Sequence, residues 1–287
     1  MKKLTSLMLI FVLTIALFAG CSNNESDDTN NNNQNDQGSS TVEDTSWKDI
    51  VAKGKIIVGL DDTFAPMGFR DEDDNLVGFD IDLANAVGDY LGIEIEFRPI
   101  DWKTNITELD GKRVDCLWNG MSATPARQKS MCLTNKYMNN QIILMTTKED
   151  ITVTSTADLV GKQIGVQAGS AALEAMEAHE DYDTFKANVL EYDTYDEAIL
   201  NMQAGRLDVI VIDEIFGNYK DKVLGHILKT MDFVFGPDYY AIGCRKADIA
   251  LKDKINEAIQ ALINNGIAEQ ISNKWFDRNL VIFEDYQ

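Results

Sequence analysis

The stretch NGMSATPAR, residues 119–127, directly follows a short apolar run, residues 114–118, and decides how the first half of the chain folds. A turn with glycine, serine and threonine before a proline is typical of a strand that passes into the N-terminus of a helix. Free N–H groups at such an end favour an anion, and Ser122 and Thr124 add hydroxyl groups. Arg127 on the first turn can bind a carboxylate through two parallel hydrogen bonds. The stretch predicts either a carboxylate site or an ordinary helix start with a solvated arginine.

The composition limits the size and the class of the protein. A chain of 287 residues, 45% of them hydrophobic, is long enough for two domains with separate cores. The formal net charge of −21 would repel nucleic acid and anionic lipid surfaces, so we expect neither as a partner. His179 and His226 are far apart and have no cysteine at ligand spacing, so the sequence predicts no metal site and no cofactor.

The N-terminal segment has the pattern of a bacterial export signal. Two lysines precede an apolar run at residues 7–18, and small residues then lead to Cys21. The junction LFAGCS, residues 17–22, resembles a lipoprotein signal, in which the cysteine becomes the lipidated first residue of the mature protein. We therefore expect a signal peptide at residues 1–20 and lipid attachment at Cys21. A plain signal peptide with an incidental cysteine is the alternative.

The next segment, residues 21–46, is rich in Asn, Asp, Ser and Thr and contains almost no apolar side chain. Such a segment cannot bury enough surface to offset the entropy of ordering, so we expect a disordered tether. As a random coil it would span about 25–30 Å between a membrane anchor and a folded body that begins with a short helix near Trp47.

Strands and helices alternate along the folded part. KIIVGL, residues 55–60, is a β-branched run typical of a buried strand, DDTFAPMGF, residues 61–69, has the character of a loop, and residues 78–91 have helical apolar spacing before Gly92. This alternation predicts parallel sheets covered by helices on both faces, with ligands at the carboxyl ends of the strands. Four groups of residues should gather at that edge: Asp61, Phe64, Trp102 and residues 119–127.

The second half repeats the pattern. Residues 161–176 predict a strand, a Gly/Ser turn and a helix that starts at Ser170. Residues 207–214 predict a strand that ends at Asp213, and residues 250–263 predict an amphipathic helix.

Several motifs resemble the polar amino-acid-binding solute receptors of ABC importers. They are IIVGLDDTFAPMGF (residues 56–69), LVGFDIDLANAVGDYLG (76–92), IDW (100–102), NGMSATPAR with Tyr137 downstream, and GIAEQISNKWF (266–276). The resemblance runs from about residue 55 to residue 276. The sequence departs from the family pattern at Cys132 and Leu133, where an acid or small residue and a phenylalanine are usual. It departs again at AIGC, residues 241–244, which replaces an aliphatic end.

This resemblance implies an α/β, two-lobe, type II periplasmic-binding-protein-like fold, with a doubly wound sheet in each lobe and two hinge strands. Lobe 1 would contain residues 47–142 and 237–287, and lobe 2 residues 143–236, with hinge crossings near residues 139–146 and 233–239. The implied function is that of a monomeric extracytoplasmic lipoprotein, not an enzyme, that carries an amino acid to the permease subunits of an ABC importer.

The resemblance also implies a set of ligand contacts for the two charged groups of an amino acid. Arg127 would clamp the α-carboxylate together with N–H groups of Ser122 and of the turn Ser170–Ala171. Asp213 would accept hydrogen bonds from the α-ammonium, with the carbonyl of Gly120 as a second acceptor. Charge-assisted bonds of about 1.5–3 kcal/mol each are the largest interactions that such a site offers.

The side chain of the ligand would meet a second set of residues. Phe64 and Trp102 would sandwich it, and Asp61, Asn119 and Gln167 would line the far end. Taken alone, the two aromatic residues are more typical of a core than of a ligand cage. In the same way, an aspartate at a strand end, such as residue 213, is also typical of a helix N-cap.

Asp62 offers a further hypothesis. If this carboxylate faced the cleft beside its neighbour, the pocket would favour a cationic ligand side chain such as that of lysine or arginine. A solvated carboxylate is the alternative.

Three cysteines remain after the expected anchor: Cys116, Cys132 and Cys244. The odd number leaves at least one thiol outside any intramolecular bridge. A bridge between Cys116 and Cys132 is compatible with an oxidising compartment, whereas buried thiols that pack as small hydrophobic side chains are the favoured state.

An enzyme on the same scaffold is the alternative function, because a fold does not fix a function. Cyclic-acid dehydratases resemble these receptors and would need a general acid in the cleft, for which Glu214 or Asp61 could serve. A related lytic transglycosylase would need a further catalytic domain, and a membrane sensor would need a second apolar span, and we expect neither here.

Overall fold

The computed structural model describes residues 43–286, so the expected signal peptide, Cys21 and most of the expected tether lie outside the described residues. Asp44 Oδ2 accepts a hydrogen bond of 2.6 Å from the N–H of Ala250, so the chain already contacts the folded body before residue 46. Helix α1 (Ser46–Lys53) is the short helix that the sequence predicts near Trp47. Within the described residues, no helix combines the length and the apolar character that crossing a membrane requires.

The sheet of lobe 1 is mixed rather than purely parallel. Its strand order is β5-β1-β6-β13-β7. Strand β1 (Lys55–Leu60) pairs in parallel with β5 (Glu94–Pro99) and β6 (Cys116–Leu117), as the alternation of strands and helices predicts. Strands β13 (Gly243–Arg245) and β7 (Met131–Leu133) are antiparallel additions. Because β13 comes from the last fifth of the chain, lobe 1 is built from two separate segments.

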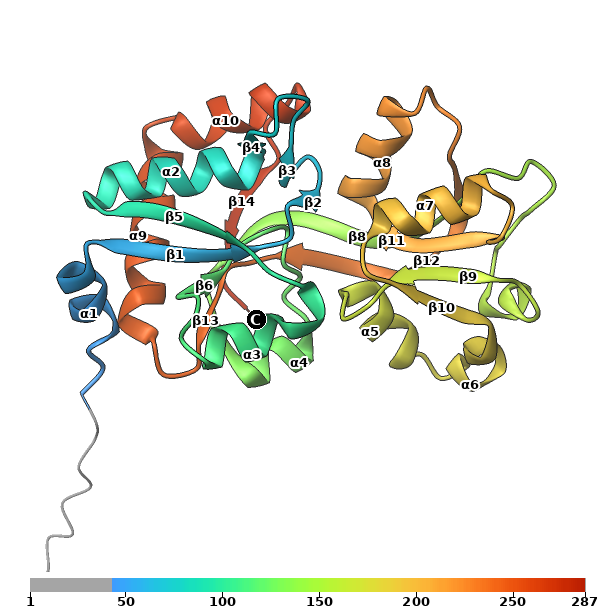
Figure 1. Ribbon diagram of the computed structural model, residues 1–287, viewed down its shortest axis with the longest axis horizontal. Coiled ribbons are helices and arrows are strands. Elements are labelled where there is room, and N and C mark those ends of the chain that lie inside the picture. Colours follow the sequence, from blue (N-terminus) through green and yellow to red (C-terminus); the bar gives the residue numbers. More distant parts are fainter. Residues whose placement is uncertain (1–42, 287) are drawn as a thin grey trace, which may run out of the picture. The chain divides into compact units, whose positions relative to one another are not determined.

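Helices cover both faces of this sheet (Figure 1). Helices α1, α2, α9 and α10 pack over one face. Helix α3 packs over the other face, where Leu109 of α3 and Leu117 of β6 belong to one buried cluster. Helix α2 ends at Gly92, whose φ of +67° satisfies the left-handed C-cap that the sequence predicts. The bounds are α2 Phe79–Leu91, α3 Asn105–Asp110 after the 3₁₀ turn Trp102–Thr104, α4 Pro125–Ser130, α9 Ile249–Asn264 and α10 Ile267–Phe276.

The sheet of lobe 2 has the order β10-β9-β11-β8-β12, and β14 pairs with β8. Helices α5 and α6 pack on one face and α7 and α8 on the other (Figure 1). The strands are β8 Lys136–Thr146, β9 Ile164–Gln167, β10 Val189–Tyr192, β11 Val209–Asp213, β12 Lys229–Tyr240 and β14 Val281–Glu284. The helices are α5 Ala171–Glu177, α6 Tyr182–Phe185, α7 Tyr195–Gln203 and α8 Glu214–Val223, with 3₁₀ turns at Thr156–Leu159 and Lys186–Asn188.

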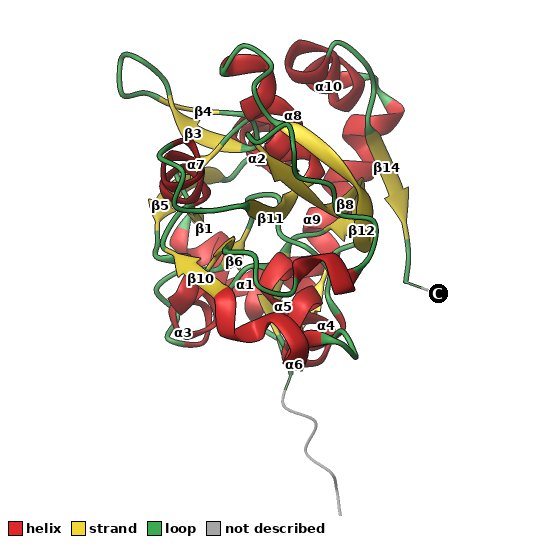
Figure 2. Cartoon of the chain, turned by 90° about the vertical axis from the view of Figure 1, so that its right-hand side faces the viewer, coloured by secondary structure: helices red, strands yellow, loops and turns green. Residues whose placement is uncertain are grey.

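Two long antiparallel strands, β8 and β12, connect the lobes (Figure 1). The C-terminal half of β8 pairs with β11 of lobe 2, and its N-terminal end pairs with β14, which lies beside β8 and β12 in Figure 2. At its end in lobe 1, β12 reaches Tyr240, which forms a bridge with Ser122. The predicted lobe boundaries, at residues 142/143 and 236/237, fall inside these two strands.

A small antiparallel sheet corrects one prediction from the sequence. Residues 61–69, predicted as a loop, contain β2 (Thr63–Phe64) and β3 (Gly68–Arg70), which pairs with β4 (Leu76–Val77). Strands of two or three residues are too short to produce an alternating pattern, because only pairing with a distant segment distinguishes them from a loop.

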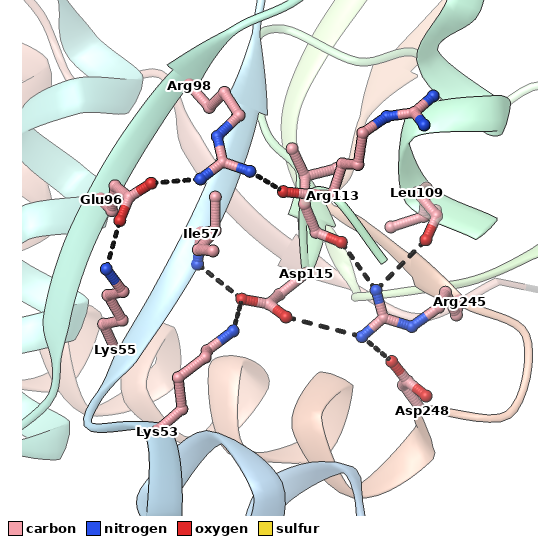
Figure 3. Close-up of polar contacts among 11 residues, drawn as sticks. Lys53, Lys55, Ile57, Glu96, Arg98, Leu109, Arg113, Asp115, Arg245 and Asp248 are labelled. Carbon is pink, nitrogen blue, oxygen red and sulfur yellow. Dashed lines mark hydrogen bonds and ion pairs between the residues drawn. The ribbon is translucent and has the colours of Figure 1, made fainter. Parts of the chain in front are cut away.

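An ion-pair network joins the strands of lobe 1 to its helices (Figure 3). Asp115, only 6% exposed, pairs with Lys53 at the end of α1 and with Arg245 of β13, whose nitrogen lies 3.6 Å from the carboxylate. Arg245 also pairs with Asp248 at 2.6 Å and donates to the carbonyl of Val114 at 2.7 Å. The network therefore fastens elements from both segments of lobe 1 to one another.

Candidate functional site

One small cavity between the lobes is lined by eleven residues, and these are the eleven that the sequence analysis proposes as ligand contacts. The cavity is nearly closed: its volume of about 20 Å³ is far below the range of about 300–1,000 Å³ for small-molecule sites, so an amino acid could enter only after the lobes separate. The structure thus brings all eleven together, while their role in binding stays a prediction. They are Asp61, Phe64, Trp102, Asn119, Gly120, Ser122, Arg127, Gln167, Ser170, Ala171 and Asp213.

The ends of parallel strands bring these residues to one place. Asp61 directly follows β1, and Asn119 lies two residues beyond β6. In lobe 2, Gln167 ends β9 and Asp213 ends β11, while Ser170 is the N-cap of α5. The rule that ligands meet parallel sheets at the carboxyl ends of their strands therefore accounts for the location of the cavity.

Arg127 is deeply buried, with 4% of its surface exposed, so the alternative of a solvated arginine is wrong. Its guanidinium donates to the carbonyl of Ser122 at 3.2 Å in lobe 1 and to that of Gly169 at 3.1 Å in lobe 2. Its Nε lies 3.3 Å from a carboxylate oxygen of Glu174 on α5, and its Cζ lies 5.9 Å from the ring of Trp102. One cation therefore contacts both lobes. The sequence analysis missed Glu174, which only the packing of α5 brings close.

The turn after β6 depends on a glycine. Gly120 has φ of +54°, and a Cβ there would lie 2.8 Å from a ring carbon of Phe64, so no larger residue fits. Its N–H donates to the buried carboxylate of Asp80 at 2.6 Å, which also accepts from the hydroxyl of Tyr137 at 3.0 Å. Burial raises the pKa of Asp80 to about 7. Asp80 belongs to the GFDID motif, but no local signal in the sequence indicates that it positions this turn.

Asp213 is the buried carboxylate on the lobe-2 side. It is the N-cap residue of α8 but makes no side-chain capping bond, so the capping role that the sequence leaves open is absent. It accepts instead from Asn140 Nδ2 at 2.8 Å and from the hydroxyl of Tyr240 at 3.1 Å. Burial, together with the negative charge of Asp238, raises the pKa of Asp213 to about 7.

Asp238 is a second acid beside this carboxylate, and the sequence analysis missed it. The same Asn140 Nδ2 donates to Asp238 at 2.8 Å, and the hydroxyl of Ser122 donates to it at 2.6 Å. Burial raises the pKa of Asp238 as well. The Ser122 hydroxyl thus contacts the connecting strand β12, although the residue also lines the cavity.

Asp61 lies at the other end of the cavity. It accepts from Thr63 at 2.6 and 2.9 Å, and Gln167 Nε2 donates to it at 2.6 Å across the two lobes. Burial raises the pKa of Asp61. Asn119 Nδ2 is buried nearby and has no hydrogen-bond partner among the described residues. This end therefore combines a carboxylate with two amides.

Asp62 does not line the cavity. It pairs with Arg70 at 2.9 Å on the surface, so the hypothesis that Asp62 selects a cationic ligand from within the cleft is wrong. Its neighbour Asp61 is the acid that reaches the cavity.

The two aromatic residues belong to the core and to the cavity at once. Phe64, 6% exposed, stacks on Phe216 of α8 with ring centroids 4.9 Å apart and lies 6.2 Å from Tyr195 of α7. Trp102, 8% exposed, packs with buried side chains such as Leu109. The alternatives of core and ligand cage are therefore not exclusive, because one ring face can pack while an edge lines the cavity.

A larger and more open cavity lies beside the first, between α4, α5 and β12. The two cavities share only Ala171. Buried charges of opposite sign from both lobes converge in the smaller one, which is the arrangement expected for a polar ligand. We therefore assign the candidate site to the smaller cavity.

Comparison with known proteins identifies the family of the chain. The family model of bacterial extracellular solute-binding proteins, family 3, matches residues 56–278. The chain belongs to this family. The arginine-binding extracellular protein ArtP of Bacillus subtilis is 33% identical over 229 residues, covering 78% of this chain and 87% of ArtP. The L-cystine-binding protein TcyA of the same organism is 26% identical and covers 98% of this chain and 99% of its own length.

A solved structure supports the family membership and the fold. The substrate-binding protein of an ABC uptake transporter from Streptococcus pneumoniae, with bound histidine, superposes with a TM-score of 0.77 at 35% identity, over 83% of this chain and 98% of that one. The two-lobe, type II fold that the family resemblance implies is therefore confirmed for this family-3 protein.

Proposed function

We propose that this family-3 protein binds a free α-amino acid in the cavity between its lobes. The observation that carries the proposal is the convergence of one buried guanidinium, on Arg127, and one buried carboxylate, on Asp213, from opposite lobes onto one cavity. An amino-acid zwitterion presents the complementary pair of charges. The relatives bind arginine, cystine or histidine by their names, which supports the same ligand class here.

The charges that line the cavity favour a ligand with a cationic side chain. Arg127 is the one cation among the eleven lining residues, whereas Asp61 and Asp213 are both acids. A zwitterion has no net charge, so it would leave one buried carboxylate without a counter-charge, at a high desolvation cost. A cationic side chain near Asp61 would remove that imbalance. Arginine is therefore the first ligand to test, with lysine, histidine and cystine beside it.

The binding step would proceed by closure of the lobes. Hydrogen bonds already cross between them, from Gln167 to Asp61 and from Arg127 to Gly169. A ligand carboxylate on Arg127 and a ligand ammonium on Asp213 would add charge-assisted bonds to both sides and so favour the closed form. We expect small-angle scattering to report a smaller radius of gyration at saturating ligand. Unchanged profiles would contradict closure.

In the cell, the loaded protein would deliver its amino acid to the permease subunits of an ABC importer. It would act outside the cytoplasm as a monomer, held at the membrane by a lipid on Cys21. The cleavage and lipidation signal at residues 17–22 supports this anchoring. Radiolabelled palmitate that enters the wild-type chain, but not a Cys21→Ser variant, would test it.

The enzyme alternative has less support. Of the two candidate general acids for a dehydratase, Asp61 lines the cavity and Glu214 does not. Asp61 is also occupied by hydrogen bonds from Thr63 and Gln167. We therefore propose binding without turnover.

The decisive experiment is a thermal-shift screen of the purified protein against the twenty amino acids, cystine, two polyamines, two sugars and a cyclic acid. A ligand at 100 times its Kd stabilises the protein by about 2.7 kcal/mol, which raises Tm by about 5–10 °C in a protein of this size. Arg127→Ala should abolish the shift, and Arg113→Ala, an exposed arginine paired with Glu108, is the matched control. A response to a sugar or a cyclic acid alone would overturn the proposal.

A further inference from the structure

Three cysteines lie in register across three neighbouring strands of the lobe-1 sheet. Cys244 of β13 is directly opposite Cys116 of β6 on one side and Cys132 of β7 on the other. Residues directly opposite one another on antiparallel strands point to the same face, with Cα atoms about 4.5–5.5 Å apart. A disulfide requires a Cα separation of about 4.4–6.8 Å. Cys244 is therefore within bonding reach of either neighbour.

The same register excludes the bridge between Cys116 and Cys132 that the sequence leaves open. Their strands lie on opposite sides of β13, so the two residues are separated by two strand spacings, roughly 9–10 Å. Cα atoms more than about 7 Å apart cannot be bridged without movement of the backbone. Any bridge among the three must use Cys244.

Accessibility distinguishes the two remaining pairs. Cys132 lies on the edge strand of the sheet and is 9% exposed, whereas Cys116 and Cys244 are fully buried. The Cys132 thiol donates to the carbonyl of Arg245 at 3.1 Å. Its contact with the Cys244 thiol lowers the pKa of Cys132 and raises that of Cys244, and burial raises the pKa of Cys116. The thiolate is the reactive form of cysteine, so Cys132 is the residue that attacks first.

We propose that Cys132 and Cys244 are an oxidation site that forms a cross-strand disulfide, with Cys116 remaining a free thiol. Each of these two cysteines lies where the sequence departs from the family pattern, and the two are directly opposite one another on neighbouring strands. The family is extracellular by its description, and disulfides persist in such oxidising surroundings. In the described structure all three thiols are free.

The bond would have a topological consequence. Strand β7 directly precedes β8, and β13 directly follows β12, so Cys132 and Cys244 lie at the lobe-1 ends of the two connecting strands. A bond between them would close a covalent ring that contains both connecting strands and the whole of lobe 2. It would also hold the two connecting strands together at their lobe-1 ends.

The oxidation proceeds by thiol–disulfide exchange with a disulfide oxidant. The Cys132 thiolate attacks one sulfur of the oxidant, which forms a mixed disulfide and releases one thiolate. The Cys244 thiolate then attacks the Cys132 sulfur, which forms the protein disulfide and releases the second thiolate. The two cysteines lose two electrons and two protons, and the oxidant is reduced to two thiols.

Differential alkylation of the full-length chain tests the proposal. The protein is incubated with glutathione disulfide, free thiols are blocked with a light reagent, and the reduced and denatured protein is then labelled with a heavy one. We expect the heavy label on Cys132 and Cys244 and the light label on Cys116, with the same result in Cys116→Ser. Heavy label on Cys116, or light label on all three cysteines, would overturn the proposal.

Limited proteolysis of the wild-type chain gives a second readout. After oxidation, one cut between residues 147 and 228 should leave fragments that stay together on a non-reducing denaturing gel and separate after reduction. Oxidation should also raise Tm by about 4–16 °C, since it closes a ring of more than a hundred residues. Cys132→Ser, the matched control, should show neither effect. Fragments that separate without reductant in the oxidised wild type would contradict the bond.

Discussion

The cavity and the Asp115 network both bury carboxylates beside arginine, but their charges balance differently. In the network, Asp115 and Asp248 are matched by Lys53 and Arg245. In the cavity, a single arginine stands among two lining acids, with Asp238 and Glu174 as further acids beside them, and Asp213 has a pKa raised to about 7. Charges that the chain neutralises itself hold the fold together. The unbalanced ones mark the place where a ligand can supply the missing positive charge.

The largest expected effect is a loss of stability when the Asp115 network is broken. Asp115→Ala removes a carboxylate that pairs with Lys53 and Arg245 and accepts from the N–H of Ile57 at 2.7 Å. Breaking a buried pair by removing one partner leaves an uncompensated charge, so we expect the free energy of unfolding to fall by about 3–5 kcal/mol. Urea unfolding measures this loss. Ligand affinity of the folded fraction should stay unchanged.

Glu108→Ala is the matched control for that prediction, because its partner Arg113 is a surface residue. Exposed pairs are worth about 0–1 kcal/mol, so its stability should change little. Equal losses in the two variants would show that the buried network has no special importance.

The second-largest expected effect is a loss of ligand affinity when Arg127 of the cavity is changed. Arg127→Lys keeps the charge but removes the planar fork that matches a carboxylate, so we expect the Kd for the amino acid to rise about 100-fold, or about 2.7 kcal/mol. Isothermal titration calorimetry measures it. A change below about threefold would mean that another group binds the carboxylate.

A third prediction concerns the selection of the ligand side chain. Asp61→Asn should weaken binding of a cationic amino acid about tenfold, because it removes the lining carboxylate nearest the expected side-chain end. Asp62→Asn is the matched control: Asp62 pairs with Arg70 outside the cavity, and its loss should change Kd less than about twofold. The reverse order of effects would return the selective role to Asp62.

The smallest expected effect is a dependence on pH. Because the pKa of Asp213 rises from 3.8 to about 7 in the folded protein, the contribution of this group to stability is full below about pH 4 and is lost between about pH 4 and 7. A ligand ammonium requires the ionised carboxylate, so binding releases a proton. We expect Kd to be about fivefold weaker at pH 6 than at pH 7.

Calorimetry in two buffers with different ionisation enthalpies would count the released proton. Asp213→Asn should bind more weakly and should lose most of this pH dependence. If the variant kept the full dependence, the titrating group would lie elsewhere, with Asp238 as the first candidate.

Much of the site could be predicted because the family motifs imply its residues, and these lie next to recognisable strand ends and helix starts. The helix start at Ser170 and the strand end at Asp213 were both predictable from apolar runs and turn residues. The groups around them were not. Glu174, Asn140 and Asp238 become visible only when α5 and the connecting strands are placed against lobe 1.

The sequence by itself determined the alternating α/β architecture, because this depends on local periodicity. Its motifs also determined the family, and the resemblance to that family implied the set of residues that line the cavity. Only the tertiary structure decided which carboxylates are balanced and which cysteines face one another. Burial and strand register depend on segments more than a hundred residues apart. Cys132 and Cys244 show the physical reason: a shift of one residue in register would place them on opposite faces of the sheet.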